Sequence, residues 1–142
     1  MKLFKPLLIA VAMLGIGLHQ VQAGSTDWVS EEAFYDAIAP FADKWMEPSD
    51  LAVRITDGKP EFRSTWKEDS GAFSWSIYPV SGRAQADAII KEHAEAENLL
   101  GGMDRLCLHK FARAVNGDDE YYLLYLVDHE QSGLRCIALP SN

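Results

Sequence analysis

The stretch that decides the fold is residues 51–78, which read LAVRITDGKPEFRSTWKEDSGAFSWSIY. Within it, Asp57-Gly58 is typical of a two-residue β-hairpin turn, because both residue types accept the left-handed backbone conformation that such turns require. A turn at this point places Val53 opposite Phe62 in an antiparallel pair of strands. Side chains alternate between the two faces of a strand, so the turn also fixes which residues face the core.

A second turn, at residues 68–71, predicts a third strand. It places Trp66 opposite Phe73 and Phe62 opposite Ile77, in agreement with the register of the first turn. The sequence therefore predicts a three-stranded antiparallel meander with one apolar face. The members of that face are Leu51, Val53, Ile55, Phe62, Trp66, Phe73, Trp75 and Ile77.

An amphipathic helix is predicted ahead of the meander, at residues 30–46. Ser30 is a suitable N-cap, because its hydroxyl can accept a hydrogen bond from a backbone N–H of the first turn. Apolar side chains recur at helical spacing at Phe34, Ile38, Phe41 and Trp45. Pro40 lies inside this run and lacks a backbone N–H, which predicts a kink or an early end of the helix.

A second helix is predicted to begin at Ser81 or Ala84 and to run to Leu100. Gly101-Gly102 follows it, and glycine is the residue that most often ends a helix. Its apolar residues recur on one face, so we expect that face to pack against the sheet.

Strands are predicted again in the last third of the chain. Residues 106–115 and 120–128 flank Asn116-Gly117, a second strong hairpin signal. The later of these strands is apolar without alternation over most of its length, which indicates a central strand covered on both faces. A final short strand is predicted at residues 134–139.

The predicted order of elements is thus α-βββ-α-βββ. We expect an α+β fold in which two helices pack on a curved antiparallel sheet. The pattern leaves open whether the sheet forms one layer or two.

Residues 1–23 have the three parts of a secretory signal peptide. Lys2 and Lys5 form the positive start, an apolar run of 12 residues follows, and Ala23 suits cleavage by signal peptidase. The apolar run is shorter than the ~20 helical residues that span a bilayer. We therefore expect cleavage near Ala23, no membrane anchor, and a mature single α+β domain of residues 24–142 in the periplasm or outside the cell.

The chain is acidic, with a formal net charge of −8. Cleavage removes two lysines and no acidic residue, which moves the net charge to about −10. Excess negative charge disfavours nucleic acid and anionic membrane surfaces as partners. It favours a basic protein partner, or simply keeps an exported protein soluble.

The two cysteines, Cys107 and Cys136, allow two interpretations. An oxidising compartment favours a disulfide between them. In a simple meander, however, they lie on strands separated by a third strand, roughly 10 Å apart, whereas a disulfide needs Cα atoms within about 7 Å. Either the last segment leaves the ladder and folds back over the first strand, or the thiols stay free.

The most specific candidate for a ligand site is the polar face of the predicted meander. Arg54, Arg63 and Lys67 collect there together with Tyr78. Such a face can bind a carboxylate or a phosphate through charge-assisted hydrogen bonds. The alternative is an ordinary solvated sheet surface on which Arg54 pairs with Glu61 across the strands.

The histidines offer a weaker candidate, for a metal. His93 and Glu97 lie one helical turn apart, and His109 or His129 would complete a site if the fold brought them close. Nothing in the spacing fixes the distance from helix to strand. We therefore predict no bound metal and no cofactor.

Motifs for catalysis are missing from the sequence. There is no Gly-x-Ser-x-Gly elbow and no phosphate-binding glycine loop. Asp118-Asp119 is an acid pair, but it lies at a hairpin turn, where aspartates are common for backbone reasons. We therefore expect a protein that is not an enzyme.

Three functional hypotheses follow. The first is an exported, non-enzymatic protein-binding module, such as an inhibitor or immunity-like protein for a basic partner. The second is a carrier or sensor of small anionic ligands that uses the polar face of the first sheet. The third is a small hydrolase or a metal enzyme.

Overall fold

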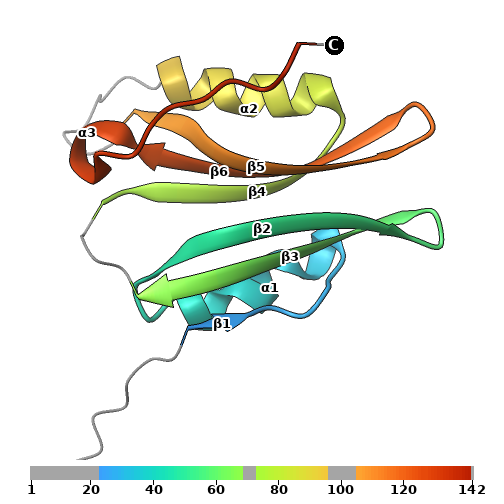
Figure 1. The fold of residues 1–142 in the computed structure, drawn as a ribbon, viewed down its shortest axis with the longest axis horizontal. Helices are drawn as coiled ribbons and strands as arrows, with labels where there is room; N and C mark the ends of the chain where they lie inside the picture. The colour runs from blue at the N-terminus through green and yellow to red at the C-terminus, as the bar shows by residue number, and fades with distance from the viewer. Residues whose placement is uncertain (1–22, 69–72, 96–104, 142) are drawn as a thin grey trace, which may run out of the picture.

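The computed structural model describes residues 23–68, 73–95 and 105–141, which form two three-stranded antiparallel sheets and three helices (Figure 1). The first sheet has the strand order β1-β3-β2 and the second has the order β4-β6-β5. The elements, in chain order, are β1 (Gly24–Ser25), α1 (Glu31–Ala42), β2 (Met46–Thr56), β3 (Lys59–Glu68), β4 (Trp75–Ser81), α2 (Arg83–Glu95), β5 (Leu106–Asn116), β6 (Asp119–Asp128) and α3 (His129–Ser132). The α+β class is confirmed, and so is the predicted order of the long elements from α1 to β6.

The hairpin of β2 and β3 has the predicted turn and the predicted register. Val53 lies opposite Phe62 and Arg54 opposite Glu61. The turn residues Asp57 and Gly58 have φ angles of 52° and 74°, so both adopt the left-handed conformation that a tight hairpin needs.

The predicted pairing of the third strand is wrong. Strand β4 does not pair with β3. It pairs with β6 in the second sheet, where Ile77 lies opposite Tyr125. The free edge of β3 is occupied by the two-residue strand β1 and by a bridge from Val29 to Phe62. The turn predicted at 68–71 lies largely outside the described residues.

Two apolar clusters form the core, one on each side of the second sheet. The first cluster joins α1 to the inner faces of both sheets, and its buried members are Phe34, Ile38, Met46, Leu51, Phe62, Trp66, Ile77, Leu123, Tyr125 and Val127. The second lies between the second sheet and α2, which covers the side of that sheet turned away from the first sheet (Figure 1). Its buried members are Val80, Ala86, Leu106, Leu108, Tyr122, Leu124, Leu126 and Leu139.

Strand β6 contributes alternate residues to both clusters, so the predicted central strand with two covered faces is confirmed. Its hairpin with β5 turns at Gly117-Asp118, one residue later than expected, because Asn116 and Asp119 pair with each other. A hydrogen bond also joins the two sheets, because Lys110 Nζ on β5 donates to the Ser49 carbonyl of β2 at 2.7 Å.

Helix α1 begins as predicted and ends early. The Ser30 hydroxyl accepts a hydrogen bond from the Ala33 N–H at 3.4 Å, and the helix ends at Ala42, two residues after Pro40. The expectation that Trp45 continues the apolar face is therefore wrong. It adopts a φ of 57° beyond the helix end, and 79% of its surface is exposed.

Helix α2 is described as far as Glu95, so its predicted end at Gly101-Gly102 lies outside the described residues. Residues 134–139, expected as the last strand, instead follow α3 as an irregular segment that lies along β5. The Ile137 N–H donates to the Leu108 carbonyl at 2.7 Å.

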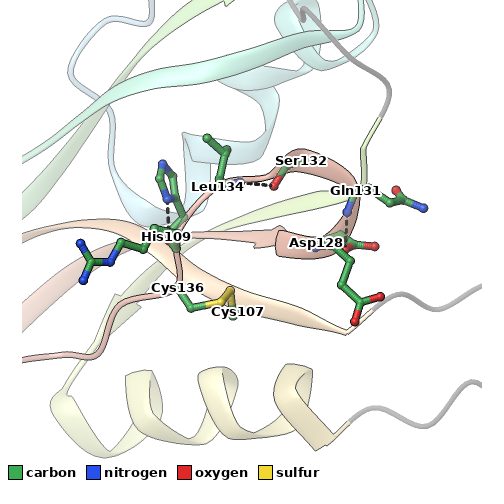
Figure 2. The surroundings of a disulfide bond; sticks show 9 residues. Cys107, His109, Asp128, Gln131, Ser132, Leu134 and Cys136 are labelled. Atoms are coloured by element: carbon green, nitrogen blue, oxygen red, sulfur yellow. Dashed lines mark hydrogen bonds between the residues drawn. A yellow bond between two sulfur atoms is a disulfide. The ribbon is translucent and has the colours of Figure 1, made fainter.

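The path of this last segment brings Cys136 to Cys107, and the two form a disulfide with Cα atoms 5.6 Å apart (Figure 2). Of the two alternatives left open by the sequence, the segment leaves the ladder and folds back over β5. A disulfide of this kind is compatible with an oxidising compartment.

Candidate functional site

The residues predicted from the sequence to bind a ligand lie on the outer face of the first sheet, with one exception. Arg54 on β2 and Arg63 and Lys67 on β3 share this face, as the register requires. Tyr78 does not, because β4 belongs to the second sheet. Its hydroxyl forms a 2.8 Å hydrogen bond with His93 Nε2 of α2, and its ring packs against the second apolar cluster.

Two of the three cations on this face are already paired. Arg54 Nε donates to the Glu61 carboxylate at 2.6 Å, and the Thr56 hydroxyl donates to the same oxygen at 2.8 Å. The hydrogen bond from Thr56, followed by that from Arg54, lowers the pKa of Glu61. Lys67 Nζ lies 3.0 Å from a carboxylate oxygen of Glu47, a buried residue.

Arg63 forms no ion pair with any residue that the structure describes. Instead it faces Trp28, an aromatic residue ahead of α1 that belongs to no helix or strand pattern in the sequence. The guanidinium carbons of Arg54 and Arg63 lie 4.3 and 6.0 Å from the centre of the Trp28 ring, within the range of cation–π attraction.

Next to Trp28 is a hollow of about 230 Å³ whose lining includes Asp50, Arg63 and Thr65. The charges around it balance, because Glu61 offsets Arg54 and Asp50 stands beside Arg63. This weakens the anion-binding interpretation of the outer face.

A second candidate surface is the end of the molecule where both long hairpins turn (Figure 1). The two hairpins are connected there by the Asn116 side-chain amide, which donates to the Gly58 carbonyl at 3.3 Å. We call the surface the acidic end and define it by five residues, namely Glu31, Asp57, Asp118, Asp119 and Glu120. Its turns are well formed because Gly58 and Gly117 take the positive φ angles that the turns require.

The acidic end contains a hollow of about 480 Å³ between the β5–β6 turn and the start of α2. Asp118, Asp119, Glu120, Arg83 and Tyr121 line it. Arg83 is engaged elsewhere, because its Nε donates to both carboxylate oxygens of Asp87 at 3.0 Å.

Glu120 is also engaged internally. It accepts a hydrogen bond from the Tyr122 hydroxyl at 2.6 Å and forms an ion pair with Arg113, and these contacts lower the pKa of Glu120, the tyrosine contributing most. Burial, followed by the contact with Glu120, raises the pKa of Tyr122.

The remaining aspartates of this end are different. Asp57, Asp118 and Asp119 are exposed and form no ion pair within the described part of the chain. The hydroxyl of Ser81, a residue that lines the hollow, donates to Glu31 at 3.0 Å and so holds this carboxylate close to the hollow. Asp57, Asp118 and Asp119 thus carry negative charge that no ion pair in the described part of the chain compensates.

The three histidines considered for a metal do not converge on one another. His93 bonds to Tyr78, and His109 Nδ1 lies 2.8 Å from the Arg135 carbonyl, which accepts its hydrogen bond. His129 begins α3, next to the disulfide. Glu97, the expected partner of His93, lies outside the described residues.

Within residues 23–68, 73–95 and 105–141, no helix is long and apolar enough to cross a membrane. Comparison of the chain with protein-family models, with curated proteins and with solved structures finds no match.

Proposed function

We propose that this protein is an exported, non-enzymatic binding module whose acidic end engages a basic surface of a partner protein. Export is supported by the signal-like residues 1–23 and by the disulfide, which is stable in an oxidising compartment. A protein of this kind suits an inhibitory or immunity-like role, in which the binding surface blocks the partner.

The observation that carries the proposal is the hollow beside two uncompensated aspartates. Asp118 and Asp119 stand at its rim, and the nearby cations Arg83 and Arg113 are neutralised by Asp87 and Glu120. A volume of about 480 Å³ admits a lysine or arginine side chain of a partner. The carboxylates would bind it by charge-assisted hydrogen bonds, which are stronger than neutral ones.

The overall charge also favours a basic protein as the partner. A chain with a net charge of −8 attracts a basic protein at long range, and this attraction raises the association rate. Such steering weakens as salt is added, because the Debye length falls to about 3 Å at 1 M ionic strength.

The test is affinity capture by the immobilised mature chain from the extracytoplasmic fraction of the cells that produce it. The wild type is expected to retain a basic protein that elutes when sodium chloride is added. The double variant Asp118→Asn, Asp119→Asn keeps the shape of both side chains and removes their charge. It is expected to retain at least tenfold less of that protein.

A matched control is the double variant Glu92→Gln, Glu130→Gln, which loses the same net charge from exposed positions on α2 and α3. Wild-type retention by this control supports the acidic end as the binding surface. Equal loss in both double variants would instead attribute capture to net charge alone. Unchanged capture by the aspartate variant would overturn the proposal.

A second candidate, a small-ligand site at Trp28 and Arg63, is favoured by the hollow beside them and by the unpaired guanidinium. A thermal-shift screen with small carboxylates and phosphates tests it, because a ligand of the folded state raises the melting temperature. The shift is expected to disappear in Arg63→Ala. A screen without a shift, or a shift that the variant retains, rejects this site.

A further inference from the structure

The disulfide region brings together three side chains of metal-binding type from three separate segments. Cys107 is on β5, His129 is the first residue of α3, and Cys136 is on the C-terminal segment. Their sulfur and imidazole nitrogen atoms all lie within 4.8 Å of one another. His129 and Cys136 are exposed, so the group is accessible from solvent.

Contacts other than the disulfide hold Cys136 in this position. The residue before it, Arg135, accepts a hydrogen bond through its carbonyl from His109 Nδ1 at 2.8 Å (Figure 2). The residue after it, Ile137, donates its N–H to the Leu108 carbonyl at 2.7 Å. The C-terminal segment is therefore attached to β5 on both sides of Cys136, and opening the disulfide leaves these bonds intact.

His129 is positioned just as independently of the sulfur–sulfur bond. Asp128, the last residue of β6, accepts hydrogen bonds through its carboxylate from the N–H groups of Glu130 and Gln131, at 2.9 and 3.1 Å (Figure 2). These bonds fix the first turn of α3 directly after a buried strand. The backbone that carries His129 is therefore held by contacts that do not involve the disulfide.

We propose that the dithiol form of this protein binds one zinc ion through Cys107, Cys136 and His129. Zinc prefers thiolate sulfur and imidazole nitrogen, at about 2.3 and 2.0 Å, which places neighbouring ligand atoms of a tetrahedron about 3.5 to 4 Å apart. The three ligand atoms already lie within 4.8 Å of one another, and the two sulfurs, bonded to each other in the disulfide, must move apart by about 2 Å after reduction. Water or a further ligand completes the fourth position.

Zinc binding requires two steps, reduction of the disulfide and then replacement of the thiol protons by the metal. A dithiol of the thiol–disulfide oxidoreductase type passes two electrons and two protons to the Cys107–Cys136 bond, which yields two thiols while the dithiol becomes a disulfide. Zinc then replaces the two thiol protons, which leave to solvent, and the neutral imidazole of His129 donates its lone pair. In the reverse direction a disulfide of the same oxidoreductase type accepts two electrons from the two thiolates and becomes a dithiol, the Cys107–Cys136 bond re-forms and the ion is released, so the site is present in only one redox state.

The test is a titration of the full mature chain with Zn²⁺, and with Co²⁺ as a spectroscopic probe, before and after reduction by a phosphine that is then removed. Reduced wild type is expected to bind one ion per chain, with the thiolate-to-cobalt absorption in the near ultraviolet. The oxidised protein is expected to bind at least tenfold more weakly and to lack that absorption.

Variants distinguish zinc binding by all three residues from zinc binding by the two cysteine thiols alone. His129→Ala is expected to weaken zinc binding at least tenfold, whereas the matched control His93→Ala, on α2, retains wild-type affinity. Cys136→Ser is expected to reduce the cobalt absorption by about half or more. Equal affinity of the His129→Ala and wild-type proteins, or a reduced chain that binds no zinc whether folded or not, would overturn the proposal.

Discussion

Individual acidic residues differ in whether a neighbouring cation or hydroxyl group pairs with them. This difference separates acids that stabilise the fold from acids that are available to bind another molecule. Glu61 and Glu120 are each held by a hydroxyl and a guanidinium, and both have a lowered pKa. Asp118 and Asp119 sit next to Glu120 without such partners among the described residues. We infer that the first pair of acids stabilises strands, whereas the second pair is available to another molecule.

The lowered pKa values predict how stability depends on pH. Both glutamates bind a proton less readily in the folded chain than at their ordinary pKa of 4.5. Their contribution to stability is therefore complete above about pH 4.5 and is lost as the pH falls through the lowered values. We expect the urea midpoint to fall as the pH drops below about 4.5, and Glu120→Gln to reduce that dependence.

Urea unfolding at pH 7, 5, 4 and 3 measures this effect in the wild type and in Glu120→Gln. The matched control is Glu92→Gln, which removes an exposed acid of α2 that has no ion pair in the described part of the chain. Identical pH dependence in all three proteins would contradict the role given to Glu120.

At the scale of elements, the pairing of β2 with β3 is determined by the turn that joins them. The pairing of β4 is not determined by its neighbouring residues. The hairpin forms where two residues of positive φ stand between two alternating strands. Strand β4 carries the same alternation, and its Ile77 enters the same cluster as Phe62, although it belongs to the other sheet. Alternation therefore predicts which residues are buried, but it does not say which strand lies next to them.

The turn itself gives a prediction. Gly58→Ala adds a Cβ that meets no atom closer than 4.0 Å, so the cost comes from the backbone at φ +74° and not from a clash. We expect a loss of about 1 to 2 kcal/mol in the free energy of unfolding, the penalty of an L-residue in this conformation. The adjacent exposed substitution Lys59→Ala should change stability by less than about 0.5 kcal/mol. Urea denaturation distinguishes the two, and equal effects would argue against backbone strain.

At the scale of the whole molecule, the disulfide connects segments 29 residues apart in sequence and attaches the C-terminal segment to β5. The same segment reaches α2, where Arg83 donates to the Pro140 carbonyl at 2.6 Å and Leu139 joins the second apolar cluster. The C-terminal residues are thus part of the packing of the second sheet. Their attachment does not depend on the disulfide alone.

Removal of the disulfide should therefore destabilise the protein without unfolding it. The double variant Cys107→Ser, Cys136→Ser is expected to lose about 3.6 kcal/mol in the free energy of unfolding, the chain-entropy cost for a loop that closes over 29 residues. Reduced wild type, measured without metal, should show the same loss in urea denaturation. A variant as stable as the oxidised wild type would show that the bond does not constrain the unfolded chain.

The sequence by itself determined the features that depend on short-range preferences. These are the Ser30 cap, the early end of α1 near Pro40, the Asp57-Gly58 turn with its register, and the burial of β6 on both faces. Each follows from backbone conformation or side-chain period within a few residues, so no distant partner is needed.

Only the tertiary structure decided which distant segments meet. It placed β4 beside β6, moved Tyr78 away from Arg54, set Trp28 over the arginines and joined Cys107 to Cys136. It also gathered the acids of two hairpin turns at one end of the molecule. The physical reason is that many pairings bury the same apolar face, and the choice among them is made by packing and hydrogen bonding of the complete chain.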